Sequence, residues 1–146
     1  MYRYVLLLHI LGACVWAGGH LVLLFRIFPG AVKAHSARLL LDFEQRFEAL
    51  GIGALVTQVV TGLWLASRLV PPSMWFNPAI PASQMIMIKF GVIIGTAAFA
   101  LDARFRVLPR MSDDRVATMR WHITAVTTMA VLAVAAGVGI RTGGWW

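Results

Sequence analysis

The sequence is poor in charged residues and nearly free of cysteine. Only 13% of its 146 residues are charged, Asp+Glu number 6, and Cys14 is the single cysteine. One cysteine excludes an intrachain disulfide framework and any zinc site built from several cysteines. A soluble domain carries about 25% charged residues, so a charge content this low excludes the ordinary soluble globular class.

The excess of basic residues does not indicate a nucleic-acid-binding protein. The chain has 13 Lys+Arg and a formal net charge of +7, but these residues are not gathered into a basic face or arm. In a chain that is 60% hydrophobic, basic residues report first on orientation in a membrane. The sequence therefore predicts a small integral membrane protein with no nucleic-acid partner.

Four apolar segments reach the roughly 20 residues that a membrane-spanning helix needs. We expect helices at about 4–28, 43–70, 84–107 and 116–140. Pro29, Pro71 and Pro109 predict the ends of the first three helices, and the Ser-Asp-Asp run at 112–114 predicts the N-cap of the fourth. The predicted fold is all-α, an integral membrane four-helix bundle that forms a single domain over residues 1–146.

The loop charges predict the orientation. Most basic residues lie on the first and third connections and the adjoining helix ends: Arg26, Lys33, Arg38, Arg46, Arg104, Arg106, Arg110, Arg115 and Arg120. The positive-inside rule places these connections in the cytoplasm and the N and C termini on the periplasmic side. Trp145 and Trp146 are expected to lie at the membrane interface on that side.

Ionisable residues inside the predicted helices are the first candidates for function, because they are costly in a membrane. His9 and His20 share one face of the first helix and lie about 16 Å apart along its axis. One metal ion cannot bind both, so each histidine would serve a separate site or hydrogen-bond to a neighbouring helix.

His20 and His122 lie at comparable predicted depths, about 13–15 Å from the cytoplasmic helix ends. Small residues follow His122 at helical spacing, which either permits close helix packing or leaves room for a flat macrocycle. Opposed histidines on two helices are typical of a b-type haem site. We therefore expect His20 and His122 to be the axial ligands of the haem iron, with Arg26 near a propionate.

His9 and Lys89 also lie at comparable predicted depths, both about 7–9 Å from the outer helix ends. Lys89 would bind a propionate or a quinone head group, act as a proton donor, or extend to the lipid headgroups. His9 would be a ligand or a hydrogen-bond partner at this outer site.

Copper is the alternative metal, because thioether and imidazole ligands suit Cu(I). His9, Met85 and Met87 are the candidate ligands, with His20 as a further one. Met85 and Met87 point about 200° apart on a regular helix, so they converge only where the helix is unwound. A structural alternative is that the histidines and Gln58 only join neighbouring helices by hydrogen bonds.

Several runs resemble a known family. LHILGACVWAGGHLVLLFR at residues 8–26 resembles the first helix of the CopD-like copper resistance proteins (copper resistance protein D). FEQRFEALGIGALVTQVVTGLWL, KFGVIIGTAAFALDARFR and GVGIRTGGWW continue this likeness along the chain. The register of His9, Trp16, Arg26 and Lys89 is also similar to that of the HemJ-type protoporphyrinogen oxidases.

These resemblances imply a four-helix protein of the inner membrane of a Gram-negative bacterium, with either copper handling or haem b chemistry. We expect a haem-b-binding redox or electron-transfer protein, and whether it is a membrane oxidoreductase is left open. The expected partners are the lipid bilayer and either a quinone or a periplasmic redox or copper protein. The alternatives are a copper-binding or copper-translocating protein of copper homeostasis and a structural membrane subunit.

Overall fold

The computed structural model describes residues 1–142, and the expected interfacial position of Trp145 and Trp146 lies outside this range. Four helical spans are long and apolar enough to cross a membrane: Tyr2–Lys33, Ala37–Leu69, Pro81–Arg110 and Asp113–Thr142. Each coincides with one predicted segment, and residues 1–142 contain no strand. The predicted all-α, four-helix membrane fold is therefore confirmed.

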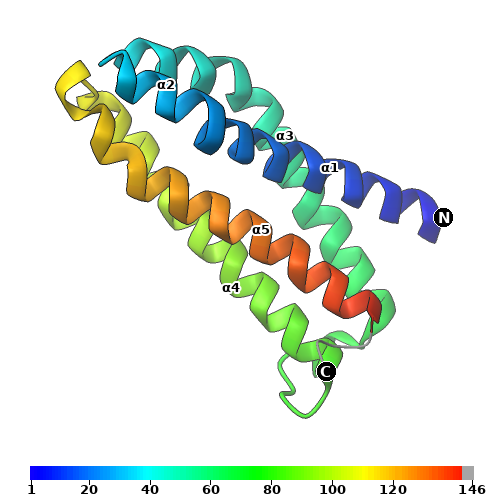
Figure 1. Cartoon of the computed structure of the whole chain (residues 1–146). Helices are drawn as coiled ribbons and strands as arrows, with labels where there is room; N and C mark the ends of the chain where they lie inside the picture. Colours follow the sequence, from blue (N-terminus) through cyan, green and yellow to red (C-terminus); the bar gives the residue numbers. More distant parts are fainter. Residues whose placement is uncertain (143–146) are drawn as a thin grey trace.

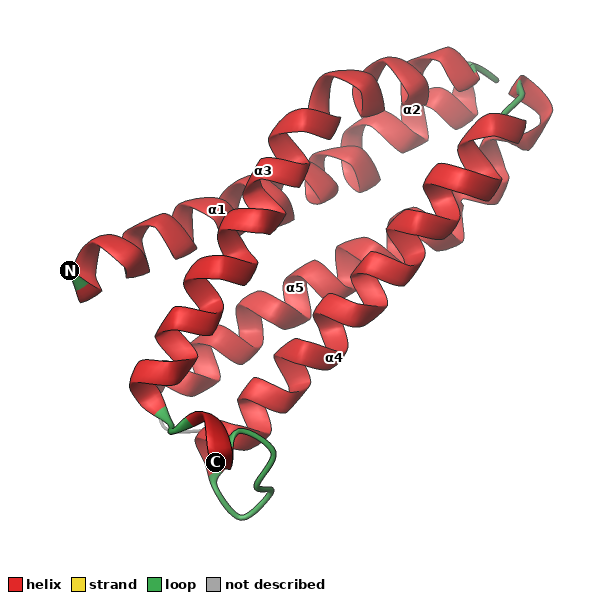
Figure 2. Cartoon of the chain, turned by 180° about the vertical axis from the view of Figure 1, so that it is seen from behind, coloured by secondary structure: helices red, strands yellow, loops and turns green. Residues whose placement is uncertain are grey.

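The helices are arranged as two antiparallel pairs. The chain forms α1 (Tyr2–Val22), α2 (Phe28–Lys33), α3 (Ala37–Leu69), α4 (Pro81–Asp102) and α5 (Arg120–Thr142). α1 packs against α3, α5 packs against α4, and α1 contacts α5 (Figures 1 and 2). α1 and α5 form one layer of the bundle and α3 and α4 the other.

The outer surface of the bundle is apolar along most of its length. Large side chains such as Phe25, Ile94 and Phe105 are at least 70% exposed. A water-soluble protein does not leave this much apolar area uncovered, whereas a lipid bilayer covers it without cost. The chain is therefore a multi-pass membrane protein whose surroundings are lipid.

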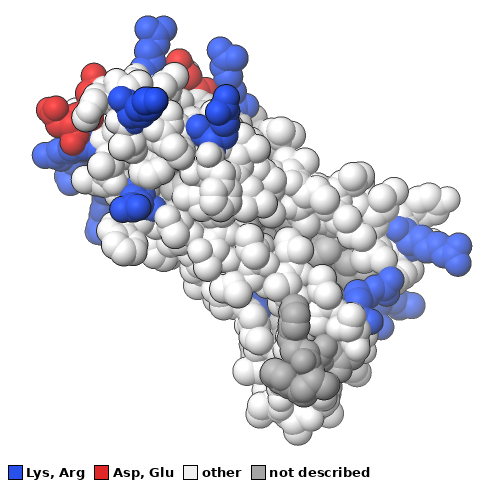
Figure 3. Space-filling view, viewed as in Figure 1, with Lys and Arg blue, Asp and Glu red and all other residues white. Residues whose placement is uncertain are grey.

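Charged side chains gather at one end of the molecule, as Figure 3 shows. We call this the basic end; it comprises α2, the connection at 34–36, the segment 103–119 and the adjoining helix ends. All six acidic residues also lie in the connections of the basic end or in the halves of the helices nearest to it: Asp42, Glu44, Glu48, Asp102, Asp113 and Asp114. The positive-inside prediction rests on this uneven distribution of charged residues between the two ends. The periplasmic position of the termini stays a prediction.

The main cluster of buried apolar residues also lies at the basic end. It consists of Phe28, Ala31, Ala37, Leu40, Val116, Met119 and Ile123. These residues come from α2, the start of α3, the segment before α5 and α5 itself. Toward the other end, the first part of α1 diverges from α5 (Figure 1). The basic end is thus the packed base of the bundle.

Pro29 does not end its helix as predicted, whereas Pro109 lies one residue before the end of the third span at Arg110, as predicted. Each follows a five-residue π-helical segment, Leu23–Ile27 or Ala103–Val107, and the first span continues to Lys33. A proline has no N–H and its ring clashes with the carbonyl four residues earlier, and a wider π turn relieves this clash. Both segments carry the same pattern, Phe-Arg-apolar-apolar-Pro, at 25–29 and 105–109.

Asp113 caps a different helix from the one predicted. Its carboxylate accepts a hydrogen bond from the backbone N–H of Ala37, the first residue of α3, at 2.7 Å. The segment Asp113–Met119 is a 3₁₀-helix with no side-chain cap of its own, and α5 begins at Arg120. Asp113 therefore joins the two connections of the basic end by satisfying an N–H that the membrane boundary would leave unpaired.

Glycines let α1 approach α3 closely. A Cβ atom on Gly12 would lie 2.9 Å from Gln58 Nε2, and one on Gly19 would overlap the Phe47 ring. Gln58 Nε2 donates a hydrogen bond to the His9 carbonyl, so the expected joining of helices by Gln58 is observed. Small residues at a helix crossing allow this close contact inside a membrane.

Gly19→Ala is expected to lower the free energy of unfolding by about 1–3 kcal/mol, because the added methyl group displaces the Phe47 ring. Thermal unfolding in detergent measures the effect. Gly18→Ala is the matched control, since nothing lies within 4 Å of a Cβ atom at that position. Equal stability of the two variants would contradict the close packing of α1 on Phe47.

Asp113→Ala is expected to cost about 0.5–2 kcal/mol of unfolding free energy, because it removes the cap of α3. Asp114→Ala removes the adjacent carboxylate, which has no hydrogen bond or ion pair within residues 1–142, and serves as the control. Thermal unfolding midpoints that fall equally in both variants would show that the Asp113 cap is not the cause.

Candidate functional site

His9 is fixed between α1 and α3 by a hydrogen bond that also determines its tautomer. His9 Nδ1 lies 2.8 Å from Thr61 Oγ1, and the Thr61 hydroxyl donates its own proton to the Thr57 carbonyl. Thr61 Oγ1 is therefore the acceptor, and the neutral imidazole carries its proton on Nδ1. The lone pair on His9 Nε2 has no hydrogen-bond partner among the described residues.

Lys89 of α4 reaches the His9 level from the opposite pair of helices. Its ammonium group lies against α5 at Gly137, where an added Cβ atom would be 3.3 Å from Lys89 Nζ. His9 lies near the start of α1 and Lys89 near the start of α4, so both residues are in the half of the bundle opposite the basic end.

His20 is held by its own helix. His20 Nδ1 lies 2.8 Å from the Trp16 carbonyl oxygen, which can only accept, so Nδ1 is the donor. The ring packs on Trp16 at 4.4 Å between centroids and meets the Phe47 ring of α3 edge-on at 5.9 Å. The His20 ring therefore lies on the α3 side of α1, with Nε2 free of hydrogen bonds within residues 1–142.

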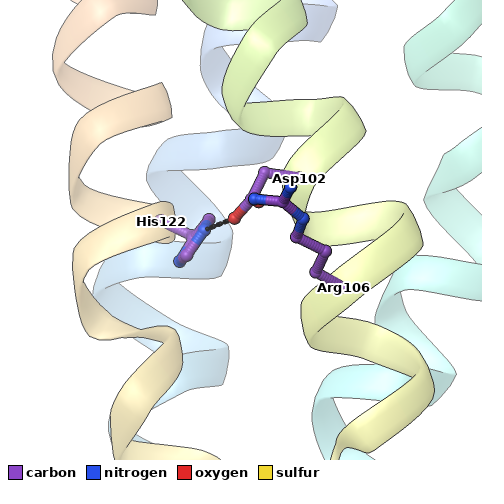
Figure 4. Close-up of polar contacts among 3 residues, drawn as sticks. All are labelled: Asp102, Arg106 and His122. Carbon is purple, nitrogen blue, oxygen red and sulfur yellow. Dashed lines mark hydrogen bonds and ion pairs between the residues drawn. The ribbon is translucent and has the colours of Figure 1, made fainter.

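His122 of α5 is held by a carboxylate of α4. Its Nε2 donates to Asp102 Oδ2 at 2.7 Å, and the other oxygen of Asp102 accepts from Arg106 at 3.2 Å (Figure 4). The Phe99 ring of α4 stands edge-on against the imidazole. His122 Nδ1 is buried and is the one buried side-chain polar atom without a hydrogen-bond partner in the described part of the chain.

The structure does not bring His20 and His122 together as axial ligands. The His20 ring faces Phe47 of α3, whereas the His122 ring faces Asp102 of α4. Thr127 of α5 donates to the His20 carbonyl at 3.3 Å, so Thr127 lies at the level of His20. His122 is five residues from Thr127, about 7.5 Å closer to the basic end. The expected match in depth and in facing direction is therefore not observed.

Met85 and Met87 do not converge either. Both lie in the regular helix α4, where Met85 is 6% exposed and Met87 is 37% exposed. Residues two apart on an α-helix point to different sides, and the helix is not unwound here. The two thioethers therefore cannot bind one copper ion together.

Arg26 is exposed on the π-helical segment after α1. It makes no hydrogen bond or ion pair with any residue in the range 1–142. It lies six residues beyond His20, about 9 Å along the helix axis, so the two side chains form no common polar cluster.

The three interior histidines share one chemical property. In each, one ring nitrogen donates to Thr61, the Trp16 carbonyl or Asp102, and the other keeps a lone pair with no hydrogen bond within residues 1–142. A metal-binding histidine has this arrangement, because the donated N–H fixes the tautomer and the direction of the ring. No group of three or more His, Cys, Asp or Glu side chains gathers around one point in this range.

Thr61 and the pairing of Asp102 with His122 were missed in the sequence. Thr61 carries no charge, and the sequence pattern assigns Asp102 to the nearby arginines rather than to a histidine. The pairing could have been predicted from the antiparallel arrangement of the third and fourth helices, because Asp102 and His122 lie about equally far from the connection between them. Glu48 of α3 and Arg104 of the π segment after α4 likewise form an ion pair of 3.1 Å between the two halves of the bundle.

A comparison with protein families finds a match over most of the chain. Residues 41–140 match the family described as copper resistance protein D. The match covers α4, most of α3 and nearly all of α5, and so includes Lys89 and His122 but not His9, His20 or Arg26. Neither a curated protein nor a solved structure matches the chain.

Asp102→Ala is expected to lower the thermal unfolding midpoint, because it leaves both ring nitrogens of His122 without a partner. Asp42→Ala is the control: it removes an acidic residue from the exposed 3.7 Å pair with Arg38, and such pairs contribute little. A midpoint unchanged in Asp102→Ala would contradict a structural role for the His122–Asp102 bond.

Proposed function

Because the chain belongs to the copper resistance protein D family, we propose that it passes Cu(I) through the interior of its four-helix bundle. Copper is the cargo in this proposal. The protein would act in the inner membrane of a bacterium, with the basic end in the cytoplasm and both termini in the periplasm.

One observation carries the proposal: three interior histidines each hold an unengaged ring nitrogen whose tautomer is fixed by the protein. Imidazole nitrogen is a suitable ligand for copper. The hydrogen bonds from His9 to Thr61, from His20 to Trp16 and from His122 to Asp102 would orient the rings before an ion arrives. Purely structural histidines would have no need of a free and buried nitrogen such as His122 Nδ1.

The spacing of these histidines supports passage rather than storage. His9 and His20 are about 16 Å apart along α1, and His122 lies about 7.5 Å further toward the basic end. Each of these three depths in the bundle offers one imidazole, and no chelating group of three His, Cys, Asp or Glu forms within residues 1–142. Several weak sites in series allow an ion to leave as well as to enter.

Lys89 would control the first of these levels. By helical rise Lys89 lies at about the depth of His9, so a cation that reaches His9 Nε2 would meet electrostatic repulsion from the ammonium group. A periplasmic copper protein that docks at this end would supply the ion. The His9–Lys89 layer would then select which ions enter from the periplasm.

Haem b is the second candidate, and one observation favours it. His20 Nδ1 donates to a backbone carbonyl and leaves Nε2 free, which is the arrangement of a haem-ligating histidine. With His20 as an axial ligand, the protein would be an electron carrier or a membrane oxidoreductase, and the second ligand would be a group other than His122.

The test is anaerobic Cu(I) titration of the detergent-purified protein against a coloured Cu(I) chelator. We expect the wild type to take copper from the chelator, and His9→Ala, His20→Ala and His122→Ala each to weaken binding by about tenfold or more. Lys89→Met is expected to strengthen binding, because it removes the repulsion at the His9 layer.

His35→Ala is the matched control, since His35 is exposed in the connection between α2 and α3. A wild type that takes no copper, or a His35→Ala variant as weak as the other three, would overturn the copper proposal. A Soret band in the purified protein that His20→Ala abolishes would establish the haem candidate instead.

A further inference from the structure

A small cavity lined by three arginines lies at the basic end, away from the interior histidines. Its volume is about 220 Å³, and it is lined by Arg106, Val107, Arg110, Met111, Arg115 and Thr118. The arginines come from three successive segments: the π turn Ala103–Val107, the 3₁₀ turn Leu108–Arg110 and the 3₁₀-helix Asp113–Met119. The chain reverses direction here, which brings these three residues around one hollow.

The charge of this cavity is not balanced by the protein. Arg106 shares the Asp102 carboxylate with His122. Arg110 and Arg115 have no ion pair within residues 1–142, and no acidic side chain lines the cavity. A guanidinium group donates two parallel N–H bonds to phosphate oxygens, so Arg110 and Arg115 beside one hollow form a site for a phosphate rather than for a cation.

The position of the cavity indicates the source of the phosphate. One membrane span ends at Arg110 and the next begins at Asp113, so the cavity lies where the hydrocarbon meets the headgroups. Val107 and Met111 are half-buried and supply an apolar wall beside the arginines. A free inorganic phosphate has no apolar part to contact these two side chains, whereas the glycerol and the first acyl carbons of a phospholipid would pack on them.

We infer that this cavity binds the phosphate headgroup of an anionic phospholipid. The guanidinium groups of Arg110 and Arg115 would donate to the phosphate oxygens, and Val107 and Met111 would contact the glycerol backbone. Basic pockets on the cytoplasmic side of membrane helices bind anionic headgroups in this way. The bound lipid would fix the turn that connects α4 to the segment before α5.

The experiment measures lipid preference of the full-length protein in nanodiscs of phosphatidylcholine that contain one-tenth phosphatidylglycerol. After transfer to mild detergent, native mass spectrometry counts the phosphatidylglycerol and phosphatidylcholine that stay bound. We expect the wild type to retain one phosphatidylglycerol, and Arg110→Gln/Arg115→Gln to lose this preference by about tenfold or more. Both arginines are exposed, so the double variant keeps the fold.

Arg38→Gln with Lys33→Gln is the matched control, because it removes two exposed basic residues from the same end but outside the cavity. Retention of phosphatidylglycerol by the Arg110/Arg115 variant, or an equal loss in the control, would overturn the proposal. Displacement of the lipid by millimolar inorganic phosphate, with no such effect of sodium chloride at equal ionic strength, would assign the cavity to free phosphate and overturn the lipid assignment.

Discussion

In the hydrocarbon of a bilayer no water replaces a missing hydrogen bond, and this constraint bears on the prolines, the helix ends and the interior histidines of the chain. Pro29 and Pro109 cannot donate, and each is preceded by a π segment; the first span continues past Pro29 to Lys33, whereas the third ends just after Pro109. The first N–H of α3 is satisfied by Asp113 from the other end of the chain.

The same constraint holds for side chains and decides what the histidines can do. His9, His20 and His122 each find one acceptor, and each acceptor is of a different kind: a hydroxyl, a carbonyl and a carboxylate. A second acceptor or donor for the remaining nitrogens would have been costly to build, and at His122 Nδ1 none is present within residues 1–142. An unpaired buried nitrogen destabilises the fold when the residue has only a structural role, whereas a metal-binding histidine needs such a nitrogen.

The four spans and the shared level of His9 and Lys89 could be predicted, because hydropathy and helical rise depend only on the sequence. The direction in which each histidine ring points could not be predicted from the sequence. His20 and His122 have similar distances to the basic end when counted from predicted helix ends, but the first span continues past Pro29 to Lys33, which moves His20 away from that end. The direction of each ring is set by its contact with Phe47 or Asp102.

The distribution of packing along the bundle bears on how an ion would move. The buried cluster around Leu40 and Ile123 lies at the basic end, whereas α1 diverges from α5 toward the end that carries His9. The first part of α1 is joined to α3 by two polar contacts, Gln58 to the His9 carbonyl and His9 to Thr61, and an ion on His9 Nε2 would leave both in place. At the packed end the Asp102 carboxylate already pairs with Arg106 and His122, so a cation there would share its charge with an existing network. Entry would therefore use a ring that α3 already holds, and exit would depend on the electrostatics of Asp102.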